Sequence, residues 1–184
     1  MGKYLNDYFV SSFQKVGTFR KVGQQKQGGN VASYFCTPAG QVLHVIAGPV
    51  DAATLLREAH WVVETRKLGL FECRGDEEGL AFQKFFRQAH VERVKEDYGL
   101  TVNIDHQPMT FPEDRKGRRG KWLRELAQNL ALGDPNRQKM LDTRGLGHLL
   151  LAKYPLVRIE KVYKLVFEQL LNERVTTLPV KEAG

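Results

Sequence analysis

Two short apolar runs separated by a four-residue turn form the clearest hydrophobic pattern in the chain. Residues 31–37 (VASYFCT) are almost continuously apolar, which is typical of a strand buried on both faces. Residues 41–47 (QVLHVIA) form the next predicted strand. Between them, Pro38 fixes φ at the first corner and Gly40 can adopt the left-handed conformation. The pattern therefore predicts a β-hairpin with a type I turn and a glycine bulge.

The flanking segments predict one earlier strand and one following helix. Residues 8–16 (YFVSSFQKV) mix aromatic and β-branched side chains and are predicted as a strand, whereas the polar, glycine-rich segment 23–30 is predicted as a loop. Apolar residues then recur at helical spacing after Asp51, the expected N-cap. Gly69 lies just past the expected end of this helix.

Beyond residue 70 the pattern is mainly helical. A long helix is predicted between Asp76 as its cap and Gly99 as its stop. Residues 101–120 contain Gly and Pro breaks and many charges, which favours a loop, and residues 121–133 (KWLRELAQNLALG) predict a helix ending at Gly133. The clearest helical stripe covers residues 155–173, with Pro155 in the first turn.

Composition narrows the class of protein. The chain has 184 residues, of which 42% are hydrophobic and 27% are charged, so a globular fold is expected. No window approaches the roughly 18 apolar residues of a membrane span, and the N-terminal residues lack the apolar run of a signal peptide. We predict an α/β fold with a small α/β unit over residues 1–68 and a helical region over residues 69–184, packed on the first.

The order of elements over residues 8–66 resembles the C-terminal part of the thioredoxin fold. The segment TPAGQVLHVIAGPVDAATLLREA carries the resemblance through its turn, strand, glycine and final helix. The resemblance implies a three-layer fold that is incomplete at its N-terminus, since the first strand and most of the first helix of that family are absent. The CxxC motif is absent as well, and Val31 occupies the position of the family's cis-proline. The peptide bond before Val31 is expected to be trans.

The two cysteines, Cys36 and Cys73, are predicted to be reduced and structural. The alternative for Cys36 is a reactive thiol beside His44. If Gly40 forms the bulge, Tyr34 faces His44, and Cys36 then lies diagonal to His44 on one face of the sheet. A protonated imidazole there would activate the thiol. Packing beside an aromatic ring is the simpler interpretation.

The histidines predict no metal site. His60 and Glu64 are four residues apart on the predicted helix and would share a face, but no third ligand is near in sequence. The remaining histidines are scattered, in the His90-x-Glu92 segment and at His106 and His148. We therefore expect them to be packed or exposed, and we expect no cofactor.

One basic segment, residues 113–125 (EDRKGRRGKWLRE), stands out from a net charge of +7. Arginine side chains suit phosphates, and an interleaved tryptophan can stack on a base. Its candidate polyanion-binding residues are Arg115, Lys116, Arg118, Arg119, Lys121, Trp122 and Arg124. An ordinary solvated loop is the competing interpretation.

Three functions follow from these patterns. The leading expectation is a redox-inactive thioredoxin-like module that binds an unidentified protein or peptide without catalysis. The first alternative is a thiol-disulfide oxidoreductase whose CxxC lies upstream of this chain, and the second is nucleic-acid or polyanion binding through residues 113–125. The sequence also predicts that the missing strand is replaced, either by direct pairing of residues 8–16 with 31–37 under the two long helices, or by a second copy in a homodimer.

Overall fold

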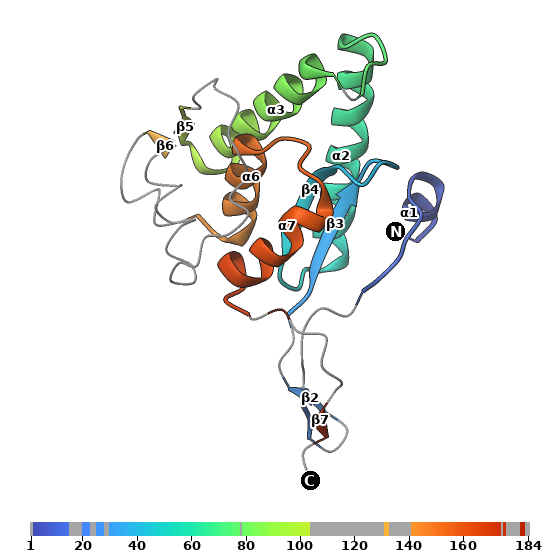
Figure 1. Ribbon diagram of the computed structural model, residues 1–184, viewed down its shortest axis with the longest axis vertical. Coiled ribbons are helices and arrows are strands. Elements are labelled where there is room, and N and C mark those ends of the chain that lie inside the picture. The colour runs from blue at the N-terminus through green and yellow to red at the C-terminus, as the bar shows by residue number, and fades with distance from the viewer. Residues whose placement is uncertain are drawn as a thin grey trace.

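The computed structural model describes residues 2–14, 20–22, 25–27, 30–77, 79–103, 131–132, 141–173, 175 and 181–182. The chain is a mixed α/β protein (Figure 1). Its helices are α1 (Gly2–Tyr8), α2 (Ala52–Glu72), α3 (Leu80–Tyr98), α6 (Thr143–Lys153) and α7 (Ile159–Leu165), followed by the π-helical turn η1 (Val166–Leu170). Its strands are β1 (Arg20–Val22), β2 (Gln25–Gln27), β3 (Ala32–Cys36), β4 (Val42–Ala47), β5 (Thr101–Val102), β6 (Ala131–Leu132) and β7 (Lys181–Glu182).

The predicted hairpin is confirmed. Strands β3 and β4 pair in antiparallel fashion. The turn between them is closed by two backbone hydrogen bonds, from Thr37 N to Gln41 O at 2.9 Å and from Gly40 N to Thr37 O at 2.9 Å. Gly40 has a φ of +79°, in the left-handed region that a glycine tolerates without strain.

Helix α2 begins as the sequence predicts and ends later. The Asp51 carboxylate accepts a hydrogen bond from Thr54 N at 2.7 Å, which confirms the N-cap. The helix passes through Gly69 and ends at Glu72, so the predicted stop at Gly69 was wrong. A Cβ at Gly69 would lie 2.8 Å from the rings of Phe82 and Phe85, so this glycine lets α2 and α3 approach each other.

Helix α3 ends as predicted but starts at a different cap. Gly99 closes it with a φ of 65°, which confirms the predicted stop. The N-cap is Gly79, so the assignment of Asp76 as the cap was wrong. The buried residues of α3 are Phe82, Phe86, His90 and Val94, spaced four apart on one face.

Helix α6 was not predicted. Asp142 caps it by accepting hydrogen bonds from Arg144 N and Gly145 N, each at 3.0 Å. Most of its residues from Gly145 to Ala152 are buried, because it packs on both β4 and α3. A Cβ at Gly147 would lie 3.2 Å from Val45 O, so the glycine permits this close approach to the strand. Helix α6 is therefore the central helix of the fold.

The predicted helix over residues 155–173 is shorter than expected. It begins at Ile159, after a turn in which Leu156 has a φ of 55°, and Pro155 lies outside it. At Val166 the α-helical hydrogen bonding changes to the wider π turn. The predicted helix over 121–133 lies mostly outside the described residues, but Ala131–Leu132 at its end form β6, which pairs with β5.

The predicted strand at residues 8–16 was wrong over its described part. Tyr8 ends α1, and residues 9–14 have no regular secondary structure. Consequently the proposed pairing with residues 31–37 does not form there; among the described strands β3 pairs with β4, while β1 pairs with β2 and with β7. This prediction failed because a short run of aromatic and apolar residues fits the end of an amphipathic helix as well as it fits a strand.

Two hydrophobic clusters enclose the hairpin. One contains Val42 and Val45 of β4 together with α6, Val162 of α7 and Val166. The other joins Phe35 and Leu43 to residues of α2 and of the first half of α3. Figure 1 shows the resulting order, with β3 and β4 between α6 and α7 on one side and α2 on the other. None of the helices in the described part of the chain has the length and apolar character to cross a membrane.

Candidate metal centre

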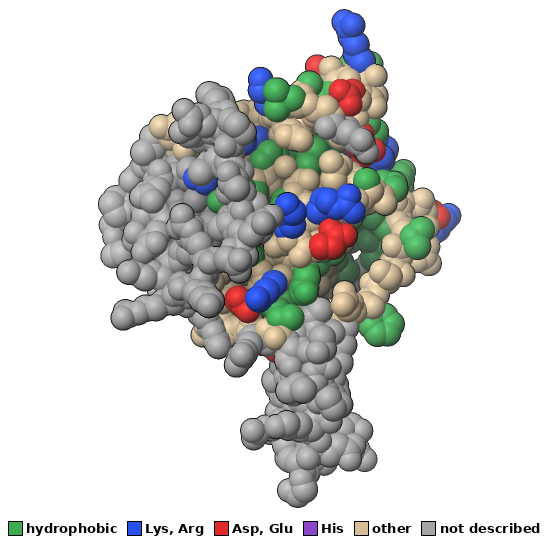
Figure 2. Space-filling model, in the orientation of Figure 1, with side chains coloured by type: hydrophobic (Ala, Val, Ile, Leu, Met, Phe, Trp, Pro, Cys, Tyr) green, Lys and Arg blue, Asp and Glu red, His purple; other side chains and the backbone are tan. Residues whose placement is uncertain are grey.

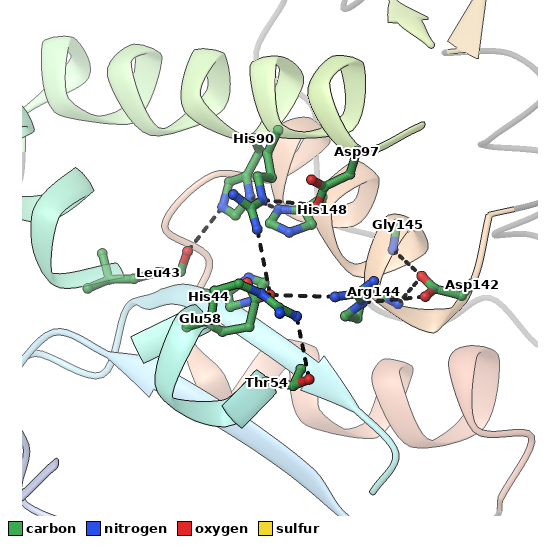
Figure 3. A network of polar contacts seen from close by, with 12 residues as sticks. Leu43, His44, Thr54, Glu58, His90, Asp97, Asp142, Arg144, Gly145 and His148 are labelled. Atoms are coloured by element: carbon green, nitrogen blue, oxygen red, sulfur yellow. Dashed lines mark hydrogen bonds and ion pairs between the residues drawn. The ribbon is translucent and has the colours of Figure 1, made fainter. Parts of the chain in front are cut away.

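Three histidines from three elements meet in the interior between the hairpin and the helices. His44 comes from β4, His90 from α3 and His148 from α6, and their exposed fractions are 0%, 1% and 1%. One ring nitrogen from each lies within 4.8 Å of the others. Figure 3 shows His90 beside His148 and His44 beside Glu58, and Figure 2 shows no histidine of the described residues on the face drawn.

The hydrogen bonds of His90 fix its tautomer. Its Nε2 lies 3.0 Å from Leu43 O, and since a carbonyl only accepts, Nε2 carries the hydrogen. The other nitrogen, Nδ1, lies 2.8 Å from Nδ1 of His148. In a neutral His90 this Nδ1 is an acceptor, so His148 Nδ1–H donates to it. The acceptor lone pair of His90 therefore points at His148.

His44 is buried without a hydrogen bond to either of its ring nitrogens within the described structure. Its Nε2 lies 3.4 Å from Oε2 of Glu58, and its ring stacks on that of His148 with a centroid distance of 4.6 Å. A buried polar atom without a partner costs about 1–3 kcal/mol. His44 thus has an unfilled hydrogen-bonding capacity, and one of its ring nitrogens lies within 4.8 Å of a ring nitrogen of each of the other two histidines.

Glu58 of α2 supplies a buried negative charge beside His44. Three guanidinium groups surround its Oε1, from Arg57 at 3.6 Å, Arg93 at 3.7 Å and Arg144 at 3.6 Å. Burial would raise the pKa of the Glu58 carboxyl, but the contact with His44 and the charges of Arg93 and Arg144 outweigh it, so the pKa lies below its ordinary value. The carboxylate is therefore ionised at neutral pH.

Two of these arginines, Arg93 of α3 and Arg144 of α6, each pair with a further carboxylate besides Glu58. Arg93 Nε lies 3.0 Å from Asp97, one turn further along α3. Arg144 Nε lies 3.4 Å from Asp142, the residue that caps α6 (Figure 3). These pairs neutralise much of the positive charge near the histidines and fix the arginines in place.

Aromatic rings enclose the histidines. The Trp61 ring of α2 lies 5.2 Å from the rings of His44 and His90 and 5.3 Å from the ring of His148, measured between centroids. Phe35 stacks on His44 at 6.0 Å. One side of the site is therefore aromatic, and the buried imidazoles have little access to water.

Burial keeps all three imidazoles neutral. It lowers the pKa of His90 to about 3. It also lowers the pKa of His44, although Glu58 opposes this effect, and the pKa of His148. Neutral imidazole is the form that binds metal ions.

The donor set fits a transition metal better than a hard cation. Three imidazoles suit Zn²⁺ and its neighbours, whereas Mg²⁺ and Ca²⁺ require oxygen ligands. Tetrahedral Zn²⁺ with nitrogen ligands about 2.0–2.1 Å away places the nitrogens about 3.3–3.4 Å apart. The separation of 2.8 Å between Nδ1 of His90 and Nδ1 of His148 is a hydrogen-bond distance, so these two rings have to move apart to hold an ion. One nitrogen of each of the three rings lies within 4.8 Å of the others, so the rearrangement needed to complete the set is small.

The surrounding acceptors match those of a metal-bound histidine. A ligating imidazole commonly donates its second N–H to a backbone carbonyl or a carboxylate, which orients the ring. His90 does so to Leu43 O, and Glu58 lies where it can accept from His44 Nε2. In this arrangement Nδ1 of His90 and Nδ1 of His44 are available to a metal. His148 has to move its hydrogen from Nδ1 to Nε2 before its own Nδ1 can bind, and the hydrogen bond to His90 is then replaced by the metal.

The predicted pairing of Cys36 with His44 was wrong. The ladder places Tyr34 opposite Val45 and Phe35 opposite His44, with the irregularity between Phe35 and Cys36 rather than at the turn alone. Cys36 therefore points to the opposite face from His44. Burial raises the pKa of the Cys36 thiol to about 11, and the negative charge of Glu160 adds to this effect.

The remaining sequence candidates lie apart from the histidine site. His60 is exposed on α2 and stacks on Tyr4 at 3.8 Å, while Glu64 pairs with Lys67 at 2.9 Å. Val31 is half exposed, and the peptide bond before it is trans. Glu92 is exposed on α3. His106 and the basic segment 113–125 lie outside the described residues.

The site was missed because its members are far apart in the sequence. A signal was nevertheless present, since each histidine interrupts an otherwise apolar pattern: His44 within VLHVIA, His148 within GHLLLA, and His90 in the row of Phe82, Phe86 and Val94. A buried histidine needs a partner. Three such histidines in one core indicate that they are one another's polar partners.

The function of this site has to be inferred from its own chemistry, because comparison with known proteins gives no relative. The fold contributes a dry interior, three neutral imidazoles and one ionised carboxylate. No family model, curated protein or solved structure matches this chain.

Proposed function

We propose that this chain binds one divalent transition-metal ion, best matched by Zn²⁺, through His44, His90 and His148. The observation that carries the proposal is the convergence of three neutral, buried imidazoles, one of which has no hydrogen bond to either ring nitrogen from the described residues. Once His148 carries its hydrogen on Nε2, a metal ion would bind one nitrogen of each ring and remove the cost of one unpartnered nitrogen of His44.

The role that the position favours is structural. The three ligands come from β4, α3 and α6, so a bound ion would connect the hairpin to the two helices that pack on it. Binding to the folded state alone stabilises a protein by about 2.7 kcal/mol when the free ion is at one hundred times its dissociation constant. Removal of the ion would weaken the contact between β4 and α6.

The test is a metal titration of the chelator-treated protein. We expect one equivalent of Zn²⁺ or Co²⁺ per chain by calorimetry, with a rise in the melting temperature. The variants His148→Gln and His90→Gln should each lose this binding, and circular dichroism should establish that they fold. His60→Gln is the matched control, since it changes an exposed histidine of the same protein. Equal, weak binding by the wild type and by all variants would refute the proposal.

We also propose, as a second function, the redox-inactive thioredoxin-like module expected from the sequence. The order of hairpin and helix over β3, β4 and α2 supports the likeness, and the raised pKa of Cys36 supports the lack of thiol chemistry. An insulin-reduction assay with dithiothreitol should show no rate above the protein-free control. A rate that disappears in Cys36→Ala would contradict this second proposal.

A further inference from the structure

A groove between α2 and α3 leads to the histidines from outside. It has a volume of about 210 Å³ and is lined by residues of both helices, among them Trp61, Leu68, Phe85, Glu92, Arg93 and Glu96. Trp61 is shared between the groove and the centre, because its ring also contacts His44, His90 and His148. The indole thus contacts both the groove and the three imidazoles.

The groove has negative charge at its outer end. Glu92 and Glu96 are exposed and lie one turn apart on α3, so both carboxylates lie on the same side of the helix. Arg93 lies between them in sequence, but its guanidinium is paired with Asp97 at 3.0 Å and faces Glu58 at 3.7 Å. The positive charge is therefore compensated on the inner side, and the mouth of the groove attracts cations.

We infer that the α2–α3 groove is the route by which a divalent metal ion reaches the three histidines. This inference rests on the proposed function. Glu92 and Glu96 collect the ion at the mouth, and the Trp61 side chain has to turn aside for the ion to pass. Glu58 stays behind the centre as the partner of His44 and takes no part in the entry.

The route predicts a change in rates without a change in affinity. The two glutamates act on the ion before it reaches the centre, so their removal should slow association and dissociation equally. In the Glu92→Gln, Glu96→Gln double variant, we expect both rate constants to fall about fivefold at low ionic strength. The difference should vanish near 1 M salt, where screening acts over about 3 Å.

Stopped-flow mixing of the metal-free protein with Co²⁺ measures these rates. Trp61 fluorescence, in a Trp122→Phe background, reports association because a bound paramagnetic ion quenches the adjacent indole. The matched control is the double variant Glu72→Gln, Glu160→Gln, which removes the same charge at exposed positions outside the groove and should keep the wild-type rates.

A second variant tests the indole. Trp61→Phe keeps an aromatic ring but replaces the indole with a smaller side chain. We therefore expect faster association and dissociation of Co²⁺. The visible absorption of bound Co²⁺ measures both rates. Wild-type rates in both the groove variant and Trp61→Phe would overturn the route while leaving the metal site intact. Absence of one-to-one Co²⁺ binding by the wild type would instead refute the proposed function.

Discussion

The Cys36 thiol is accessible and should nevertheless react slowly. It lines a cavity of about 650 Å³ together with Phe9, Thr37 and Pro38, so a small reagent can approach it. Its pKa is raised from 9.0 to about 11, first by burial and then by the charge of Glu160. At pH 7.5 the thiolate fraction is therefore about one hundredfold lower than that of an ordinary thiol.

The intrinsic reactivity of the thiolate offsets part of this loss. Nucleophilicity in thiol–disulfide exchange rises with the pKa of the attacking thiol, with a Brønsted coefficient of about 0.4–0.5. A rise of two pKa units thus makes each thiolate about eightfold more nucleophilic, and the net rate at pH 7.5 should be about tenfold lower than that of an unperturbed thiol. The protonation equilibrium is the larger effect, so Cys36 is slow.

The assay is the reaction of a small aromatic disulfide with the Cys73→Ala variant, which leaves Cys36 as the reporting thiol. We expect the native rate at pH 7.5 to be about tenfold below the rate in urea, and to rise about tenfold per pH unit up to pH 10. The same variant with Glu160→Gln should react faster, because one negative charge near the thiolate is gone. A native rate above the rate in urea, or a pH midpoint below 9, would refute the reasoning.

Three further predictions concern the packing around the centre, each measured as the free energy of unfolding in urea. Asp142→Ala should destabilise by about 1 kcal/mol because the N-cap of α6 is lost, whereas Asp142→Asn should cost less. Gly69→Ala should destabilise by about 1–2 kcal/mol, because the clash of a Cβ 2.8 Å from Phe82 outweighs the gain in helix propensity. Gly2→Ala is the control, since the space around Gly2 is open, and it should not destabilise. Equal effects of the two substitutions would contradict the packing argument. Leu150→Ala should cost about 3–4 kcal/mol because the side chain is fully buried, and a loss below 1 kcal/mol would contradict its place in the core.

The parts of the fold that were predicted depend on local chemistry. The turn at Gly40, the cap at Asp51 and the stop at Gly99 each follow from the conformational preference of one residue, and the structure confirms them. Phe82 and Val94 likewise lie on the buried face that helical spacing predicts.

The parts that were missed depend on packing between distant segments. Helix α6 contains Gly145 and Gly147, which lower helix propensity, and both glycines are explained by neighbours that no local pattern reveals: Tyr98 beside Gly145 and Val45 O beside Gly147. The pairing of Phe35 with His44 was missed for a related reason, because an irregularity next to Cys36 shifts the ladder. The three histidines were treated singly because only the tertiary fold brings them together.

The backbone of β4 is occupied on the side away from β3. Leu43 O accepts from His90, Ala47 O accepts from Thr143 Oγ1 at 2.8 Å, and Val42 N donates to Val157 O at 2.8 Å. Helices and a loop thus fill positions that a neighbouring strand would otherwise use. The hairpin can therefore be extended in one direction alone: a strand that joins this sheet, from the same chain or from another, has to join at β3.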